Sequence, residues 1–485
     1  MVALFIENYW YVLLLVNYII VVSAVISILL KNSNPNRTLT YVIVLVFFPF
    51  LGIVVYYLFG QDYRKNKIFN KKHILNKSVV KSIQKELKVN SKDIEDFCDV
   101  LGEQKAVAKF LNSNPVFPLT LNNNLEILKN GKAKFDALIA DLKNAENHIH
   151  LEYYIIKDDV IGEEILNILC LKAENGIEVR LIYDDVGSSI SKKMKNRLSQ
   201  SGVLHHPFMP VFFPRFTGKM NYRNHRKIAI IDGKIGYVGG INISDNYRNS
   251  ENSEVFLRDT HLRMEGEAVN SLQIHFLTTW DFVSDEDMKV YQDFFPENMV
   301  KEPLVALQIA ASGPDSDRPN IMEAIFTAIV TSKKYVYIAT PYFVPNEQIM
   351  TAMEIAAKSG IDVRLMVPLK SDSWVVMKAS DSYLETLLRA GVKVYKYEKG
   401  FLHAKTIVVD DTFASTGTTN MDYRSFNINF EINVMVYNPD KAAHFKSDFL
   451  TDLKHCREMD YTTHQNRSKS TRLLESFCRL WSTLI

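Results

Sequence analysis

The sequence predicts an α/β protein in which two similar α/β/α repeats follow a hairpin of two transmembrane helices. Three observations support this fold class: two long uncharged apolar runs near the N-terminus, two later regions where short strand and helix patterns alternate, and a set of polar residues that occurs twice at identical spacing. At 485 residues the chain is also longer than one hydrophobic core usually serves. We therefore expect more than one compact unit.

The N-terminal segment 1–60 is expected to anchor the protein in a membrane. Residues 9–30 and 39–59 contain no charged side chain, and each run reaches the roughly 20 residues that a helix needs to cross the hydrocarbon core. Only eight residues separate them, with the turn signal Asn-Pro-Asn at 34–36, which predicts two antiparallel spans. A cleaved signal peptide is disfavoured because Glu7 stands where a basic residue would be expected.

A basic linker, residues 61–115, follows the hairpin and predicts its orientation. Lysine and arginine next to transmembrane helices favour the cytoplasmic side, so we expect the catalytic region and the N-terminus in the cytoplasm. The same side chains would attract anionic lipid headgroups, and the pattern leaves open whether they bind lipid or only set the topology. The basic residues are Arg64, Lys65, Lys67, Lys71, Lys72, Lys77 and Lys81.

The rest of the chain predicts a first repeat over 116–299 and a second over 300–485. In each, two helix patterns alternate with two short apolar strand patterns, as in α/β units. The expected helices are 132–145, 162–175, 320–331 and 346–358, and the expected strands are 148–156, 177–183, 335–340 and 361–367. The string GIEVRL from Gly176 reappears as GIDVRL from Gly360. Such strings are common in strands, so the duplication needs a stronger match.

That match is the pattern HxKxxxxD, which occurs once in each repeat with an asparagine 17 residues after the histidine. The two sets are His225, Lys227, Asp232 and Asn242, and His403, Lys405, Asp410 and Asn420. Residues i and i+2 of a strand face the same side, so each histidine shares a face with its lysine. Each aspartate begins a turn, after which a returning strand brings the asparagine back beside the histidine.

Two such sets suit the transfer of a phosphodiester-linked group. Lysine and amide donors can neutralise the non-bridging oxygens, one histidine can attack phosphorus, and the other can protonate the leaving alcohol. No metal-binding motif such as HExxH is present, so we expect neither a metal nor another cofactor. The cysteines Cys98, Cys170, Cys456 and Cys478 are far apart, which argues against a disulfide framework or a structural zinc site.

On these motifs the chain resembles the phospholipase D superfamily. The texts NHRKIAIIDGKIGYVGGINISDNY and FLHAKTIVVDDTFASTGTTNMDYRSFNINFE, with FPFLGIVVYYLFG near the N-terminus, are similar to bacterial cardiolipin synthases. The resemblance implies two phospholipase D-like α/β/α repeats that form a pseudo-twofold pair with one composite site. It also implies transfer of a phosphatidyl group between two phosphatidylglycerol molecules through a phosphohistidine, in a bacterial inner membrane.

The resemblance also assigns roles to individual residues. His225 becomes the nucleophile and His403 the general acid and base, although the sequence itself shows only that the two halves are unequal. The phosphate donors become Lys227, Lys405, Asn242 and Asn420. Asp232 and Asp410 belong to the catalytic motif, but their turn positions suggest that they stabilise the site.

Each histidine also needs a carboxylate that orients its ring. Glu431, 28 residues past His403, matches the family's position and is expected to orient His403. The corresponding position of the first repeat is Ser253, so Asp259 is the expected partner of His225, with Glu254 as the weaker alternative.

Other functions share parts of this pattern. A nuclease would need a basic, aromatic nucleic-acid surface, and the formal net charge of +2 together with two membrane spans argues against nucleic acid as a partner. A phosphatidylserine synthase-like enzyme or a phospholipase would share every motif and differ only in its acceptor. A non-catalytic membrane protein would have no reason to keep both sets complete. The expected partners are phosphatidylglycerol, other anionic phospholipids and the membrane; the oligomeric state is left open.

The C-terminal stretch 471–485 predicts an amphipathic helix. Its apolar side would either pack on the catalytic body or lie on the membrane surface. The residues of that side are Leu473, Leu474, Phe477, Leu480, Trp481 and Leu484.

Overall fold

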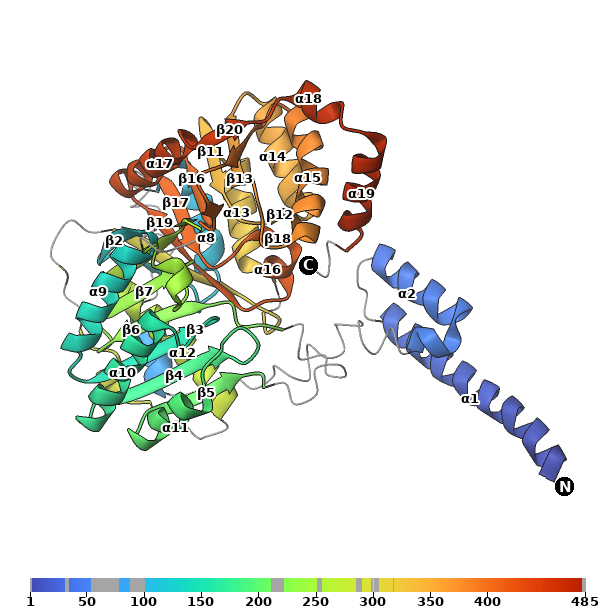
Figure 1. Ribbon diagram of the computed structural model, residues 1–485, viewed down its shortest axis with the longest axis horizontal. Helices are drawn as coiled ribbons and strands as arrows, with labels where there is room; N and C mark the ends of the chain where they lie inside the picture. The colour runs from blue at the N-terminus through green and yellow to red at the C-terminus, as the bar shows by residue number, and fades with distance from the viewer. Residues whose placement is uncertain are drawn as a thin grey trace. The chain divides into compact units, whose positions relative to one another are not determined.

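The computed structural model describes residues 2–30, 35–53, 78–87, 101–210, 222–250, 255–284, 290–297, 300, 305–316 and 318–481. The chain divides into two compact units, one formed by residues 1–70 with 211–220 and one formed by 71–210 with 221–485. The first holds the N-terminal helices, and the second holds both predicted repeats except residues 211–220 (Figure 1).

The N-terminal unit contains the long apolar helix α1 (Val2–Leu30) and the shorter helix α2 (Pro35–Phe47). They pack through Val21, Ile28 and Leu45. Among the described residues, only α1 has a segment long and apolar enough to cross a bilayer, Tyr11–Leu30, whereas the apolar part of α2, Thr38–Phe47, is shorter. Residues 54–59 of the second predicted span lie outside the described residues. One apolar helix supports membrane association.

The first repeat is built on a seven-stranded sheet with the order β2-β9-β7-β6-β3-β4-β5. These strands are β2 (Asn123–Lys129), β9 (Thr260–Gly266), β7 (Ile235–Gly239), β6 (Lys227–Ile231), β3 (His148–Tyr153), β4 (Glu178–Asp184) and β5 (Leu204–Phe208). The helices are α9 (Asn130–Asn144), α10 (Val160–Glu174), α11 (Lys192–Gln200) and α12 (Glu267–Ser284). Alternation along β3 separates two layers, because Ile149 and Leu151 join the apolar core that includes Leu138 of α9 and Ile165 of α10, while His150 contacts Phe276 of α12.

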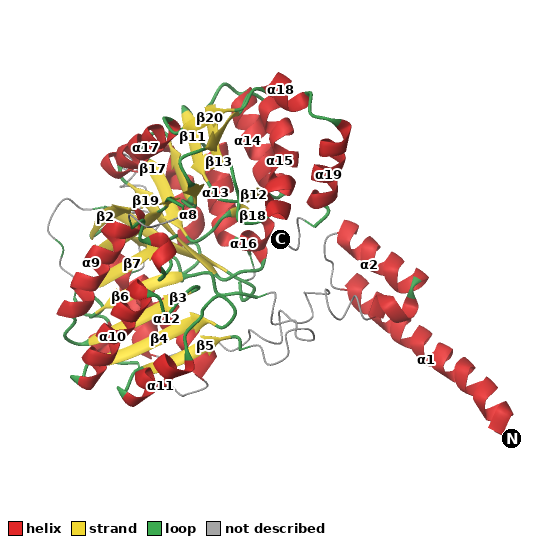
Figure 2. Cartoon of the chain, in the orientation of Figure 1, coloured by secondary structure: helices red, strands yellow, loops and turns green. Residues whose placement is uncertain are grey.

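The second repeat has a nine-stranded sheet with the order β1-β10-β19-β17-β16-β11-β13-β14-β20. These strands are β1 (Leu119–Thr120), β10 (Ala306–Ser312), β19 (Glu431–Tyr437), β17 (Phe413–Gly417), β16 (Thr406–Val409), β11 (Tyr335–Ala339), β13 (Asp362–Pro368), β14 (Lys393–Tyr397) and β20 (Cys456–Glu458). The helices that flank this sheet include α13 (Asn320–Val330), α14 (Glu347–Lys358), α15 (Trp374–Arg389) and α17 (Pro439–Leu453). Without the edge strands β1 and β20, the order matches that of the first sheet strand by strand. In Figure 2 the strands of each repeat lie between helices, so the predicted α/β repeats and their helix and strand positions are confirmed.

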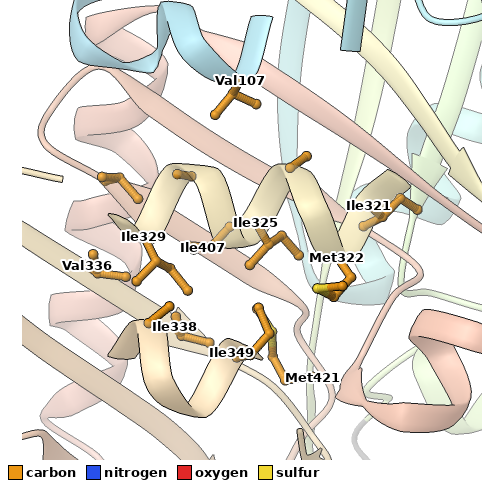
Figure 3. Packing of buried hydrophobic residues seen from close by; sticks show 14 of the residues in the cluster. Val107, Ile321, Met322, Ile325, Ile329, Val336, Ile338, Ile349, Ile407 and Met421 are labelled. Carbon is orange, nitrogen blue, oxygen red and sulfur yellow. The ribbon is translucent and has the colours of Figure 1, made fainter. Parts of the chain in front are cut away.

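Residues ahead of the first repeat pack into the second. Helix α8 (Lys105–Asn112) places Val107 on α13, where Figure 3 shows it across from Ile325, and Leu119 of β1 pairs with Gln308 of β10. From the sequence we expected Val107 in the basic linker and Leu119 in the first repeat, and therefore both outside the core of the second repeat. The reason is the apolar face of α8, which α13 covers. Most of the linker, residues 61–77 and 88–100, lies outside the described residues, which include α5 (Ser78–Glu86).

The two repeats meet through reciprocal backbone pairs. The short strand β15 (Phe401–Leu402) pairs in parallel with β8 (Leu257–Arg258). On the other side, Asn224 forms a parallel bridge with Phe430. Leu402 precedes His403 and pairs with Arg258, which precedes Asp259. In the same way, the residues before His225 and Glu431 pair with each other. This pairing brings each histidine to the opposite repeat.

Candidate active site

The two motif histidines lie just ahead of matching central strands. His225 precedes β6, and its backbone N–H donates to the carbonyl of Phe430 over 3.0 Å. His403 lies three residues before the start of β16, and its backbone N–H donates to the carbonyl of Arg258 over 2.8 Å. The strands run from the interface between the repeats into each core, so the histidines are held where the repeats meet.

The carboxylate partners are crossed between the repeats. Nδ1 of His225 lies 2.9 Å from both carboxylate oxygens of Glu431, and Nδ1 of His403 lies 2.6 Å from Oδ2 of Asp259. The expectation that Glu431 serves His403 and Asp259 serves His225 is therefore wrong. The physical reason is the reciprocal backbone pairing, which brings the start of β19 to His225 and the residue after β8 to His403. Glu254 lies outside the described residues.

Both lysines are buried beside their own histidines. Nζ of Lys227 donates to the carbonyl of His225 over 2.7 Å, and Nζ of Lys405 donates to the carbonyl of His403 over 2.5 Å. In both pairs the lysine reaches back two residues to the backbone carbonyl of its own histidine. The structure thus brings both His-Lys pairs to the interface between the repeats, with two cationic groups near the histidines.

The asparagines sit near the site but are engaged by protein groups. Asn242 donates from Nδ2 to the hydroxyl of Tyr247 over 2.7 Å, and its Oδ1 accepts from the N–H of Ile155 over 3.1 Å. Asn420 hydrogen-bonds the buried carboxyl of Asp422, while its own Oδ1 has no protein partner. The predicted role of both asparagines as phosphate donors remains a prediction.

The aspartates of the motif do not reach the site. Asp232 follows β6 with a φ of +55° and accepts from the backbone N–H groups of Glu146, Asn147 and His148. Asp410 follows β16 with a φ of +54° and accepts from three backbone N–H groups in the same way, those of residues 333–335. Both carboxylates stand at the far end of the strand from the histidine. Their placement with the catalytic residues is therefore corrected: they fasten the turn to the neighbouring strand.

Comparisons with known proteins show the family to which the chain belongs. The family model "Cardiolipin synthase, PLD-like domain" matches residues 138–280 and 325–453, and "Phospholipase D-nuclease N-terminal" matches residues 19–61. A cardiolipin synthase of Halalkalibacterium halodurans is 42% identical over 95% of this chain and 91% of its own length. A cardiolipin synthase of Geobacillus sp. is 40% identical over 96% of this chain and 92% of its own. The chain belongs to the cardiolipin synthase family of phospholipase D-like proteins.

A solved structure supports the fold of this cardiolipin synthase family member. The crystal structure of phosphatidylserine synthase from Haemophilus influenzae aligns with a TM-score of 0.60 at 14% identity, over 79% of this chain and all of that one. At that identity the likeness concerns the fold alone. It agrees with the two matching sheets described above.

In this family member, burial shifts the pKa values of His225 and of its partner Glu431 in opposite directions. Desolvation, with the charges of Lys227, Lys405 and the other histidine, lowers the pKa of His225 well below its usual value. Desolvation raises the pKa of Glu431 to about 7. Burial and Lys405 also lower the pKa of His403, but the Asp259 carboxylate acts against them.

The second carboxylate differs from the first. Burial alone would raise the pKa of Asp259, but the nearby Lys405 and His403 outweigh it and lower that pKa below its usual value. Asp259 is therefore the carboxylate that stays ionised, whereas Glu431 holds its proton more readily. The two histidines consequently face unequal partners. Burial also lowers the pKa of Lys227 to about 7 and that of Lys405 in the same direction.

The site of this family member includes residues that the sequence analysis missed. Tyr154 stacks edge-on against His225 with ring centroids 5.1 Å apart, and Tyr247 does the same to His403 at 5.5 Å. Thr418 donates from its hydroxyl to Glu431, and Asn224 is held by Asp184 and Glu152. Tyr247 falls in the text SDNY that follows the motif, and Thr418 lies within GTTN. A search of each motif's flanks could have found those two.

Among the residues that the structure describes, no group of three or more His, Cys, Asp or Glu side chains is arranged to hold a metal ion.

Proposed function

We propose that this protein transfers a phosphatidyl group from one phosphatidylglycerol to another, giving cardiolipin and glycerol through a phosphohistidine on His225. The observation that carries the proposal is the crossed pair of buried histidine–carboxylate contacts, with two buried lysines beside them. Such a set can neutralise a phosphodiester, attack it and protonate the leaving alcohol at one place. The family's relatives named cardiolipin synthase support the choice of lipid.

In the first step, Nε2 of His225 attacks phosphorus while Nδ1–H donates to Glu431. The N–P bond forms, and the bond from phosphorus to the glycerol oxygen breaks. His403 gives that oxygen its proton, so glycerol leaves as a neutral alcohol. The ammonium groups of Lys227 and Lys405 offset the charge on the non-bridging oxygens.

In the second step, a hydroxyl of another phosphatidylglycerol attacks the phosphohistidine. Neutral His403 takes the proton of that hydroxyl, the new P–O bond forms and the N–P bond breaks. His225 leaves as a free imidazole, and His403 is again protonated. Both histidines therefore return to their starting states, and atoms and charges balance over the cycle.

The unequal carboxylates support this division of roles. Asp259, with its lowered pKa, stabilises an imidazolium at His403, as a general acid requires. Glu431, with a pKa of about 7, stabilises an imidazolium at His225 less than Asp259 does at His403. This suits the nucleophile, because an attacking imidazole must be neutral. Asn242 donates from Nδ2 to the hydroxyl of Tyr247, whose ring contacts His403, and the amide N–H groups of Asn242 and Asn420 are the proposed donors to the phosphate.

The architecture that we propose extends the described helices and sheets. The matched strand orders support a pseudo-twofold pair of repeats, residues 116–299 and 300–485 behind the basic linker 61–115, with α8 and β1 added to the second repeat. Helix α1 forms the first span of a hairpin in the bacterial inner membrane, and residues 39–59 form the second. The lysines after residue 60 then place the catalytic region in the cytoplasm. Protease added outside spheroplasts should leave that region intact; its cleavage before lysis would reverse the topology.

The test of function uses the purified full chain with phosphatidylglycerol in detergent. We expect cardiolipin and free glycerol in equal amounts, and neither product from a variant that carries both His225→Ala and His403→Ala. Phosphatidic acid in place of cardiolipin would indicate a phospholipase. Product formed only after serine or another alcohol is added would indicate a different acceptor, as in a phosphatidylserine synthase-like enzyme.

A further inference from the structure

The C-terminal helix α19 (Lys469–Arg479) is oriented opposite to the usual amphipathic helix. Its polar Glu475 is 2% exposed and Cys478 is 3% exposed, so these side chains face the protein. Its apolar side faces outward together with the two residues that follow. The exposed fractions are 73% for Leu473, 57% for Phe477, 76% for Leu480 and 49% for Trp481.

Specific contacts hold α19 in this orientation. Arg467 donates to Glu475 over 2.9 Å and forms an ion pair with Glu385 of α15 at 3.3 Å. On the next turn, Cys478 joins the buried cluster of Ala379 and Val344. Turning the apolar side inward would break the ion pair of a nearly buried carboxylate, which is costly. The exposed apolar row is therefore a built feature of the folded protein.

The C-terminal end of α19 lies at the end of the repeat that carries the catalytic strands. Val344, which shares a buried cluster with Cys478 and Ala379, belongs to β12 (Phe343–Val344). That strand pairs with β18 (Met421–Asp422), which directly follows Asn420. In Figure 1 the C-terminal end of α19 points toward the end of α15 at which β12 and β18 lie. The apolar row thus leads toward the active site.

The start of α15 supports the same placement. Asp372, two residues before α15, accepts from the hydroxyl of Tyr342 over 2.7 Å, and its charge acts on the pKa of Lys405. Trp374 begins α15 and is 51% exposed. Because α19 runs antiparallel to α15, with Arg467 near Glu385 and Cys478 near Ala379, Trp374 and Trp481 are expected at the same end.

The charges of α19 match an anionic surface. Its exposed charged side chains, Lys469, Arg472 and Arg479, are all basic, and its one acidic side chain, Glu475, is buried. Exposed leucine, phenylalanine and tryptophan flanked by basic residues are typical of a helix that lies in the interface of an anionic bilayer. Tryptophan also favours the headgroup level. A protein partner would not require this basic flank.

We propose that α19 lies on the anionic bilayer, with its apolar row inserted among the lipids, and holds the end of the repeat that carries β12, β18 and the catalytic strands against the membrane from which substrate enters. This contact is separate from the N-terminal helix α1, which tethers the chain by spanning. The proposal goes beyond the proposed function, because it states where the protein meets lipid and does not depend on which lipids react.

The first test uses the full chain in membranes and needs no activity. The photoreactive residue p-benzoylphenylalanine replaces Phe477 or Leu480 in turn, and as a matched control Leu171 of α10, which is 54% exposed. We expect adducts with phospholipid at positions 477 and 480 and none at 171. Cross-linked dimers would show that a second copy covers the row, and absence of any lipid adduct at both positions would show that the row does not touch the membrane. Either result overturns the proposal.

The second test measures lipid dependence. A Phe477→Ser/Leu480→Ser variant is compared with Leu171→Ser on vesicles of phosphatidylglycerol and phosphatidylethanolamine, and on the same lipids dispersed in detergent. Loss of two inserted apolar side chains should lower the ratio of vesicle rate to detergent rate by about fivefold or more. The Leu171→Ser ratio should match that of the unaltered protein. An unchanged ratio in the double variant would refute the proposal, whereas an inactive unaltered protein that still gives lipid adducts would refute only the proposed function.

Discussion

Replacing Asp259 with asparagine removes a charge from His403 while it preserves the size of the side chain. The carboxylate lies 2.6 Å from Nδ1 of His403 and is 1% exposed, so no water takes its place easily. Because Asp259 is the carboxylate with the lowered pKa, it is the group that favours the imidazolium form of His403. Asp259→Asn should therefore weaken the general acid and leave the nucleophile His225 in place.

The structure sets the size of this effect. A hydrogen bond to a charged group contributes about 1.5–3 kcal/mol. Since about 1.4 kcal/mol corresponds to one pKa unit, the pKa of His403 should fall by about one to two units. The imidazolium fraction, and with it the rate of cardiolipin formation, should then fall about 10- to 100-fold at neutral pH.

The assay compares two leaving groups. Asp259→Asn is measured with phosphatidylglycerol, whose leaving alcohol needs a proton, and with a phosphatidyl ester of nitrophenol, whose leaving group does not. The loss should appear with phosphatidylglycerol and shrink to about threefold or less for formation of the phosphohistidine from the nitrophenyl ester. Glu431→Gln is the matched control, because Glu431 contacts the other histidine.

The control should behave differently. Glu431→Gln should slow both substrates alike, since it perturbs the attacking imidazole of His225 whatever group leaves. Equal losses on the two substrates for Asp259→Asn would contradict the pairing of Asp259 with the general acid. A leaving-group dependence found only in Glu431→Gln would restore the pairing within each repeat that the sequence suggested.

Four further outcomes are expected. With a nitrophenyl ester, His403→Ala should still form the phosphohistidine and His225→Ala should form none; mass spectrometry that finds the adduct on His403 in the unaltered enzyme would reverse the two roles. The value of kcat/KM should fall as pH rises through about 7, because the ammonium of Lys227, with its pKa of about 7, is lost there. Lys227→Arg should move that fall to higher pH in a pH–rate profile, and an unmoved profile would assign it to another group. Asp232→Ala should lower the free energy of unfolding by about 2 kcal/mol in a denaturant titration, because three backbone N–H groups lose their acceptor. Activity should survive EDTA once lipid presentation is controlled, and a saturable divalent requirement that neutral detergent cannot relieve would reveal a metal site.

Much of this protein follows from local sequence patterns. The predicted helices 162–175 and 346–358 correspond to α10 and α14, because periodicity and turn signals act over a few residues. The two His-Lys pairs were found from an offset of two along a strand, and the structure places each lysine on its own histidine. The crossed carboxylates were not predicted. A spacing of 28 residues in one repeat favoured a partner within that repeat, and no local pattern contradicts it.

The sequence by itself therefore determined the repeats, the elements and the reactive side chains, since each depends on neighbours along the chain. The tertiary structure alone decided which carboxylate serves which histidine, because backbone pairing between Asn224 and Phe430, and between Leu402 and Arg258, crosses from one repeat to the other. It also decided which side of α19 packs. Periodicity predicted that the helix has an apolar side. The ion pair of Arg467 with Glu475 holds the opposite side against the protein, so the apolar side is exposed. Which side packs depends on contacts between distant segments.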